Sequence, residues 1–218
     1  MLGDWNYTVW LTYISTLLAA LGIGICIIDP NHSTDYAIIC LVVCGGLDMF
    51  DGKIARTKKD RTEFQKDNGI QIDSLSDLIA FGMLPAAIGF NLFESIWTNW
   101  YFVFVAIVLM IYVLFGLVRL GYFNALEHER VKEEDTVLKN YTGMPITMAA
   151  FFIPIVYLLK FTNISHMAFA WVYLGFLAVL GLLFVLKIKV PKAGKKMIIA
   201  FSIFGVIFVS LFILLLCL

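Results

Sequence analysis

Residues 36–55 read YAIICLVVCGGLDMFDGKIA, and residues 70–93 read IQIDSLSDLIAFGMLPAAIGFNLF. Each stretch is about as long as the roughly 20 mostly apolar residues that a helix needs to cross the hydrocarbon layer of a membrane. The hydrophilic stretch 57–68 joins them. Together they predict two neighbouring antiparallel membrane helices, and the aspartates that interrupt both are the most informative residues of the chain.

The rest of the chain follows the same apolar pattern. Of its 218 residues, 61% are hydrophobic and 15% are charged, whereas soluble domains have about 45–50% and about 25%. A globule of this size cannot hide so much apolar surface, so the composition excludes a soluble, a disordered or a fibrous protein. We expect an all-α bundle of about seven membrane spans (six to eight), forming one domain over residues 1–218. The expected spans are 8–28, 36–55, 70–93, 99–121, 143–160, 166–187 and 197–218.

The basic residues give the bundle a direction. Six of the 16 Lys and Arg residues lie in 52–69, four in 119–140 and five in 187–196, and only Lys160 lies elsewhere. These three regions are alternate connections, so they share one side of the membrane, which the positive-inside rule makes the cytoplasmic side. The net charge of zero gives no excess of basic residues for binding a nucleic acid. The sequence thus predicts an integral protein of the cell membrane.

Four aspartates lie within predicted membrane spans, where an ionised side chain is energetically unfavourable. Asp48 and Asp51 lie near the end of one span, and Asp73 and Asp77 lie near the start of the next. An ionised side chain within a span costs at least about 2.5–3.5 kcal/mol, so such residues are by default suspected of function. Spacings of three and four residues place each pair on one face of its helix. Antiparallel packing of the two helices then brings all four carboxylates together just inside the cytoplasmic surface.

Four carboxylates in one pocket repel each other. One pair 4 Å apart costs about 4 kcal/mol at an effective dielectric constant of 20, so protons or cations must neutralise the cluster. Oxygen ligands select Mg²⁺, Mn²⁺ or Ca²⁺, and two such ions bridged by carboxylates suit in-line displacement at phosphorus. Gly52 would let a ligand approach the helix backbone, and Arg56 would pair with a phosphate. The alternative is that the acids are solvated helix ends that balance Lys53, Arg56 and Lys58.

At these residues the sequence resembles the CDP-alcohol phosphotransferase family, whose motif reads D-x-x-D-G-x-x-A-R, a spacer, and G-x-x-x-D-x-x-x-D. Every specified position is matched, by Asp48, Asp51, Gly52, Ala55, Arg56, Gly69, Asp73 and Asp77. The departure is the spacer, which has twelve residues from Thr57 to Asn68 where the family commonly has about eight; such a lengthening costs little closure entropy. It leaves open whether Thr62 or Lys66 contacts the substrate.

The resemblance implies that a small alcohol attacks a CDP-linked lipid at phosphorus and that CMP leaves. It implies that Asp48, Asp51 and Asp73 hold one divalent ion, Mg²⁺ or Mn²⁺, and that Asp48, Asp73 and Asp77 hold a second. Asp77 would also take the proton from the acceptor hydroxyl. The implied nucleotide-binding residues are Asp48, Gly52, Ala55, Arg56 and Gly69, with Thr12 from the first span.

Residues beyond the motif indicate the acceptor. The segment around Asp73 and Asp77, together with RLGYFN at 119–124 and YTGMP at 141–145, resembles the branch of the family that uses L-serine, and the resemblance covers about residues 40–160. It implies CDP-diacylglycerol as the donor. It also makes Arg119 and Asn124 candidate serine contacts, with Arg119 pairing with the serine carboxylate. The alternatives are an Arg119 that snorkels to the membrane surface and an Asn124 that caps a helix C-terminus.

Other functions stay open at this point. Within the family, the acceptor would instead be inositol phosphate, glycerol phosphate or choline, although a phosphorylated acceptor would demand more basic groups than Arg119. Outside the family, a cation transporter would use the aspartates as its ion path. Transporter sites lie near the bilayer midplane, whereas these aspartates lie near one side. The resemblance also implies a homodimer surrounded by membrane lipids.

Overall fold

The computed structural model describes residues 6–28, 33–55, 57–58, 60–97, 100–132, 140–191, 203–212 and 214. Its main helices are α1 (Trp10–Ile28), α2 (Ser33–Ala55), α3 (Glu63–Asp77), α4 (Leu84–Leu92), α5 (Phe102–Lys132), α6 (Ala149–Tyr157) and α7 (His166–Val185). A π-helical segment, η2 (Leu78–Met83), joins α3 to α4, and two short strands, β1 (Asn140–Thr142) and β2 (Lys189–Pro191), pair in antiparallel fashion. A further helix covers Ile203–Phe212.

These helices fall where the sequence predicts the spans. Four stretches are long and apolar enough to cross a membrane, namely Tyr7–Ile28, Glu63–Leu92, Phe102–Leu126 and His166–Val185. Two shorter apolar helices cover Ile146–Phe161 and Ile203–Phe212. The helix α2 has 23 residues and carries acidic or basic side chains near both ends. The structure confirms a helical membrane bundle, with seven helical segments in the part of the chain that it describes.

Two helix ends differ from the prediction. The stretch 57–68 was expected to be a polar connection, but α3 already begins at Glu63. A capping box sets this start, because the Thr62 hydroxyl accepts from the Gln65 backbone and the Gln65 side chain accepts from the Thr62 backbone. The helix α5 continues to Lys132, well past the expected end of its span at 121. Polar residues continue a helix beyond the apolar layer, so hydropathy alone does not mark its end.

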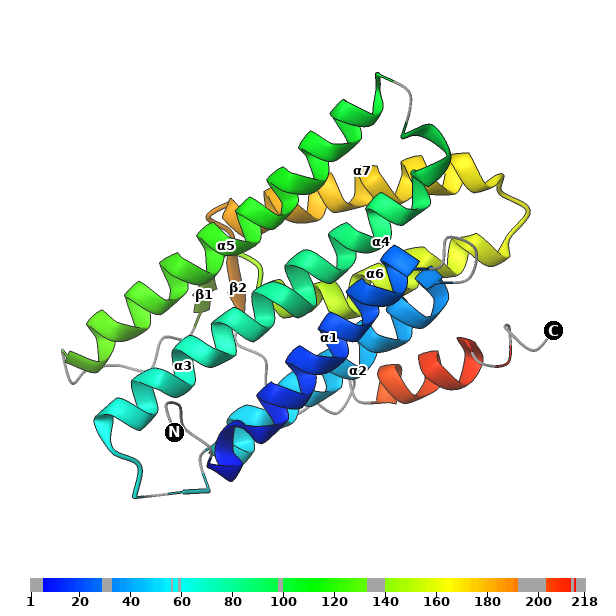
Figure 1. Ribbon diagram of the computed structural model, residues 1–218. Helices are drawn as coiled ribbons and strands as arrows, with labels where there is room; N and C mark the ends of the chain where they lie inside the picture. The colour runs from blue at the N-terminus through cyan, green and yellow to red at the C-terminus, as the bar shows by residue number, and fades with distance from the viewer. Residues whose placement is uncertain are drawn as a thin grey trace.

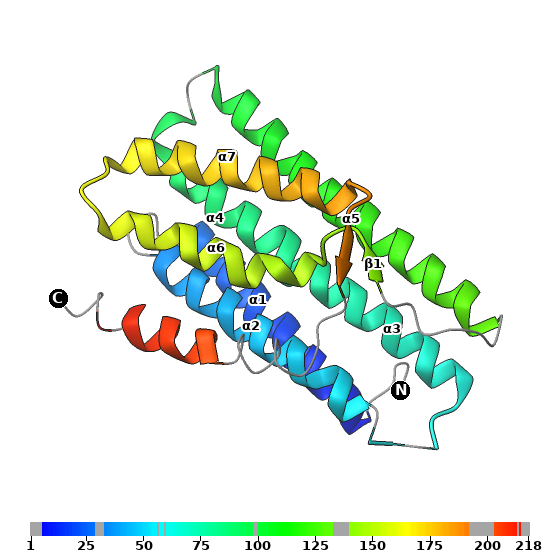
Figure 2. The same ribbon diagram turned by 180° about the vertical axis from the view of Figure 1, so that it is seen from behind.

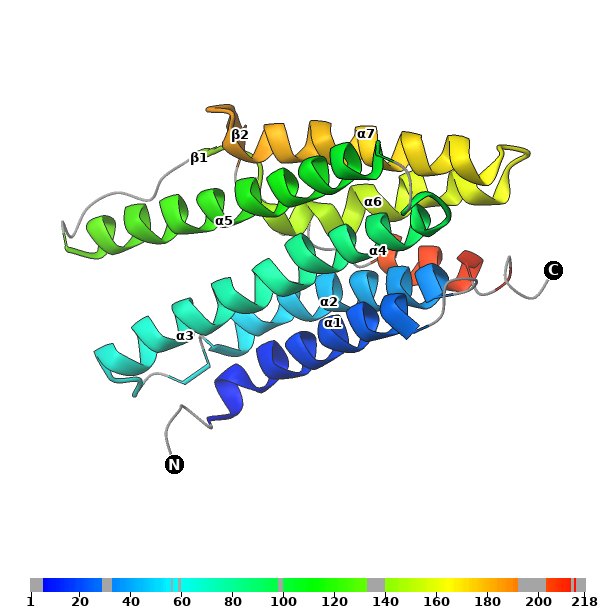
Figure 3. The same cartoon turned by 45° about the horizontal axis from the view of Figure 1, so that its top comes forward.

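The helices pack as two pairs on either side of a central rod. The helix α1 packs along α2, and α5 packs along α7. The rod of α3, η2 and α4 lies between these pairs, and α6 lies on the side of α2 and α7 (Figures 1 and 2). The Ile203–Phe212 helix, red in Figure 3, lies beside α2. The start of α1, the end of α2, the start of α3 and the end of α5 share one end of the bundle (Figure 1).

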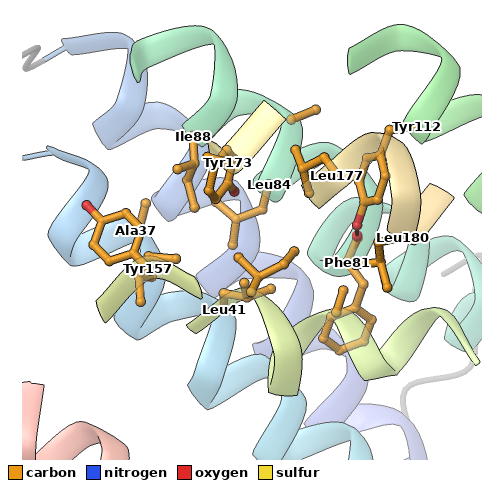
Figure 4. Packing of buried hydrophobic residues seen from close by; sticks show 14 of the residues in the cluster. Ala37, Leu41, Phe81, Leu84, Ile88, Tyr112, Tyr157, Tyr173, Leu177 and Leu180 are labelled. Atoms are coloured by element: carbon orange, nitrogen blue, oxygen red, sulfur yellow. Dashed lines mark hydrogen bonds between the residues drawn. The ribbon is translucent and has the colours of Figure 1, made fainter. Parts of the chain in front are cut away.

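Tyrosine hydroxyls join the central rod to its neighbours in the core (Figure 4). Pro85 has no N–H to donate to the carbonyl of Phe81, four residues earlier in the rod. The buried hydroxyl of Tyr112, on α5, donates to that carbonyl at 2.6 Å. The hydroxyl of Tyr173, on α7, donates to the carbonyl of Pro85 at 3.0 Å. The α5 and α7 helices therefore hydrogen-bond the rod where its helical geometry changes.

A buried polar cluster joins α2 to the end of α6 at the opposite end of the bundle from the four aspartates. Lys160 lies 2.6 Å from the Asp35 carboxylate, and Tyr157 donates to the same oxygen at 2.8 Å. Asp35 is buried and lies in the first turn of α2, where the helix dipole also favours a negative charge. This ion pair accounts for Lys160, the one basic residue outside the three basic regions.

We expect Asp35→Ala to lower the free energy of unfolding by about 3 kcal/mol, because it leaves the ammonium of Lys160 without its buried partner. Thermal unfolding of the purified protein in detergent measures the loss. The exposed Asp67→Ala on α3 is the control, and its melting temperature should stay near that of the wild type. The double variant Asp35→Leu/Lys160→Met should recover much of the loss. Equal melting temperatures for Asp35→Ala and Asp67→Ala would contradict the assignment.

Candidate active site

Three of the four aspartates converge between α2 and α3. Oxygen atoms of Asp48, Asp73 and Asp77 all lie within 4.8 Å of one another, and the three side chains are half-buried. Carboxylate oxygens at this spacing fit a single hard divalent cation, whose ligand distances are about 2.0–2.6 Å. This is the set that the resemblance assigns to the second ion. The helical spacing predicted from the sequence therefore does bring these side chains together.

Asp51, the fourth aspartate, faces the first helix. Its exposed fraction is 9%, and the hydroxyl of Thr12 on α1 donates to its Oδ2 at 3.3 Å. Asp51 and Asp73 line one cavity, so Asp51 adjoins the group of three without completing a tight group of four. The structure thus places Thr12 beside the aspartates, as its assignment to the nucleotide site requires.

A hydroxyl network fixes α1 against α3 one turn from these contacts. Thr16 donates to the hydroxyl of Ser76 at 2.8 Å, and Ser76 donates to the carbonyl of Thr12 at 3.2 Å. Ser76 directly precedes Asp77 in the helix. The bonds therefore link the position of Thr12 to that of Asp77. Nothing in the sequence singles out Thr16 or Ser76, because hydroxyl side chains are common in apolar spans and do not reveal their partners.

A polar cavity of about 170 Å³ opens on one side of the aspartates. Among the predicted nucleotide-binding residues, Thr12, Gly52, Ala55 and Gly69 line it, together with Asp51 and Asp73. Its wall is completed by two residues that directly precede α1, by two spacer residues and by one residue of α3 beyond the spacer, namely Thr8 and Val9, Arg61 and Lys66, and Ile70. Lys66, left open by the sequence, thus lies at the cavity, whereas Thr62 caps α3. Arg56 lies outside the described residues.

A larger, mostly apolar cavity of about 730 Å³ reaches Asp48. Its walls come from α2, from the start of the 146–161 helical segment and from the Ile203–Phe212 helix. Phe50, Phe151, Phe204 and Val206 are among the lining residues. The aspartates therefore lie between a polar and an apolar compartment.

The two predicted acceptor residues lie on α5, and neither lines either cavity. Arg119 is only 9% exposed, donates to the carbonyl of Met144 at 3.1 Å and lies over the ring of Phe123. A snorkelling, solvated Arg119 does not agree with this burial. Asn124 donates to Ser74, the neighbour of Asp73, at 2.8 Å. It is not a helix C-cap, because α5 continues to Lys132.

The fold and the site together define a helical membrane protein with a cluster of carboxylates that borders a polar and an apolar cavity. The model of the CDP-alcohol phosphatidyltransferase family matches residues 5–183, and the chain belongs to this family. The protein is therefore a CDP-alcohol phosphotransferase.

Three named relatives are similar to most of the chain. The chain is 29% identical over 204 residues to a CDP-diacylglycerol–serine O-phosphatidyltransferase of Helicobacter pylori strain J99, which covers 88% of this chain and 77% of the relative. It is 29% identical to the enzyme of the same name from Methanocaldococcus jannaschii, over 89% and 76%. It is 30% identical to an archaetidylserine synthase of Methanothermobacter thermautotrophicus, over 82% and 72%.

Proposed function

We propose that the protein transfers the phosphatidyl group of CDP-diacylglycerol to the hydroxyl of L-serine, forming phosphatidylserine and releasing CMP. The observation that carries this proposal is the position of the aspartates between two unlike cavities. A CDP-linked lipid has the same division, with a nucleotide at one end, two acyl chains at the other and a pyrophosphate between them. The names of the relatives and the RLGYFN and YTGMP segments support serine as the acceptor.

The two compartments match the two ends of the substrate in polarity. The apolar cavity that reaches Asp48 suits the lipid end, since its aliphatic and aromatic walls gain from burying acyl chains. The polar cavity with Thr12, Gly52 and Gly69 suits the nucleotide end. In this arrangement the pyrophosphate lies at the aspartates.

The residues then have distinct tasks in an in-line displacement. Asp48, Asp51, Asp73 and Asp77 would hold two divalent cations, Mg²⁺ or Mn²⁺, which when bound neutralise the charge of the pyrophosphate and of the leaving CMP. Asp77 accepts the proton of the serine hydroxyl. The serine oxygen forms a bond to the phosphorus that carries the diacylglycerol, and the bond from that phosphorus to CMP breaks. Thr12 holds Asp51 in place, and the Thr16–Ser76 bonds position α1 beside Asp77.

In this proposal Arg119 and Asn124 help to bind and position the serine acceptor. Asn124 acts through Ser74, which precedes the Asp77 turn on α3. Arg119 lies beside Met144, next to Pro145 on the wall of the apolar cavity. A side-chain movement that exchanges the Met144 carbonyl for a serine carboxylate would give Arg119 a charged partner.

The proposal extends to the membrane location, orientation and oligomeric state of the enzyme. We place residues 1–218 in the cell membrane as one domain, with the aspartates facing the cytoplasm. The basic connections support this orientation, because the end of α2, the start of α3 and the paired strands β1 and β2 lie toward one end of the bundle (Figure 1). The homodimer that the family resemblance implies belongs to the proposal as well.

Purified protein with CDP-diacylglycerol and radiolabelled L-serine tests the activity directly. We expect labelled phosphatidylserine and an equal amount of CMP. Inositol phosphate, glycerol phosphate and choline, supplied separately at the same concentration, should release CMP at less than a tenth of that rate. Faster CMP release with one of these alcohols than with serine would identify that alcohol as the acceptor. No CMP release with serine or with any of these alcohols would refute phosphatidyl transfer.

A further inference from the structure

Two buried polar atoms at the polar cavity lack partners. Within the described part of the chain, neither Thr8 Oγ1 nor Arg61 Nε has a hydrogen-bond partner. Thr8 is 3% exposed, and both residues line the cavity. A buried polar group without a partner costs about 1–3 kcal/mol. Two such groups on one cavity indicate that a bound ligand supplies the missing partners.

The guanidinium of Arg61 is held in place for such a task. Its Nη2 donates to the carbonyl of Gln65 at 2.9 Å, in the first turns of α3. A Cβ atom at Gly69 would lie 2.5 Å from that Nη2, so the guanidinium lies directly against Gly69 and would have to shift if a side chain replaced it. The anchor uses one nitrogen and leaves the Nε–H group for a ligand. Arg61 belongs to the long spacer and lies outside the motif.

The dimensions and lining of the cavity indicate which part of a nucleotide it takes. Asp51 and Asp73 mark the end where the pyrophosphate would lie. Val9 and Ile70 add aliphatic surface to the cavity, and Thr8 and Arg61 add the unpartnered polar atoms. A cavity of about 150 Å³ admits a benzene ring, and this one measures about 170 Å³. Its volume therefore suits one six-membered ring lying against aliphatic side chains.

We propose, resting on the function proposed above, that Thr8 and Arg61 bind the cytosine ring of the CDP-lipid and set its base specificity. Cytosine presents two acceptors, O2 and N3, beside an amino group that donates. The Arg61 Nε–H donates to the acceptor edge, and Thr8 Oγ1 accepts from the amino group. Uracil carries an N–H group at N3, where the Arg61 Nε–H would meet a second donor, so uracil mismatches Arg61, whereas the Thr8 hydroxyl can turn to donate to the uracil oxygen.

Thr8→Val and Arg61→Met test the proposal in the full-length purified protein with Mg²⁺. Calorimetry with CMP and with UMP gives the two dissociation constants, and CMP release from CDP-diacylglycerol and serine gives KM and kcat. We expect Thr8→Val to weaken CMP binding about three- to tenfold and Arg61→Met about tenfold or more. The preference for CMP over UMP should shrink in Arg61→Met, because only the donor-only guanidinium distinguishes N3 of the two bases. In both variants KM should rise while kcat changes less than twofold.

Thr8→Val also separates a ligand contact from a structural role. The variant removes a hydroxyl that has no partner in the described structure, so the melting temperature without nucleotide should stay equal or rise. Arg61→Lys keeps the positive charge but not the Nε–H group, and should bind CMP no better than Arg61→Met. The exposed Lys187→Gln, outside both cavities, is the charge control and should behave as the wild type.

The outcomes distinguish this inference from the proposed function. Unchanged CMP affinity and KM in Thr8→Val, in a wild type that is active with serine, would overturn the inference alone. An equal loss for CMP and UMP in Arg61→Met would also overturn it, because Arg61 would then hold the ribose or phosphate. Wild-type protein that binds CMP through Thr8 and Arg61 but forms no phosphatidylserine would refute serine as acceptor and leave the base site standing.

Discussion

Replacing Asp77 by asparagine should lower kcat for CMP release about 10³–10⁴-fold at saturating CDP-diacylglycerol and serine. In the proposed mechanism Asp77 accepts the proton of the serine hydroxyl, and a positioned general base contributes about 10²–10⁴-fold. The amide of asparagine accepts no proton at neutral pH, and the site also loses one of its negative ligands. Steady-state CMP release at several serine concentrations measures the loss.

Asp67→Asn is the matched control, since it neutralises an exposed carboxylate on the same helix, away from both cavities. Its turnover should equal that of the wild type. The fold of Asp77→Asn should survive, because the change removes one negative charge from a cluster whose members repel each other. The melting temperature of the metal-free variant should therefore be no lower than that of the wild-type protein. Turnover within threefold of wild type in a folded variant would exclude Asp77 as the base.

The convergence of the aspartates could be predicted from the sequence because it depends on two simple quantities. Spacings of three and four residues fix one face of a helix, and adjacent apolar spans must run antiparallel. The group formed by Asp48, Asp73 and Asp77 follows from both. The position of Thr12 at the polar cavity was predictable only through the family resemblance, because nothing in the apolar first span distinguishes this threonine from Thr16.

The role of the spacer could not be predicted, because it depends on local geometry. Hydropathy describes 57–68 as a polar loop, yet the capping box of Thr62 and Gln65 begins a helix there. That early start places Arg61 beside Gly69 and directs it to the polar cavity. A polar loop at a membrane surface gives no sign that its arginine has a buried Nε atom. The signal available in the sequence was the T-x-x-Q pattern of the capping box.

The π-helical turn after Asp77 could not be predicted from the sequence either, although Pro85 indicates an irregularity in this helix. A proline within a span removes one backbone donor, and the helix responds either by bending or by changing its hydrogen-bond pattern. Here η2 changes the pattern, and Tyr112 donates to the carbonyl of Phe81. Such π-helical turns occur frequently at functional sites. This one begins directly after the proposed base, so it sets the direction in which the rest of the rod leaves the aspartates.

Removing divalent cations with EDTA should abolish CMP release, and Mg²⁺ or Mn²⁺ should restore it. The three carboxylates within 4.8 Å of one another repel when no cation is bound. A cation that binds only the folded protein adds stability that grows with its concentration. Mg²⁺ should therefore also raise the melting temperature of the wild type, a readout that needs no substrate. The increase should be lost in the double variant Asp48→Asn/Asp73→Asn.

Asp51→Asn separates cation binding from proton transfer. Asp51 lies outside the tight group of three and accepts from Thr12, so its loss should weaken one cation site without removing the base. The Mg²⁺ concentration for half-maximal turnover should rise about tenfold or more, which corresponds to about 1.4 kcal/mol, and excess Mg²⁺ should restore part of the rate. Asp77→Asn should gain nothing from excess Mg²⁺. Full turnover of the wild type in EDTA, or equal rescue of both variants by Mg²⁺, would contradict this division between cation ligands and base.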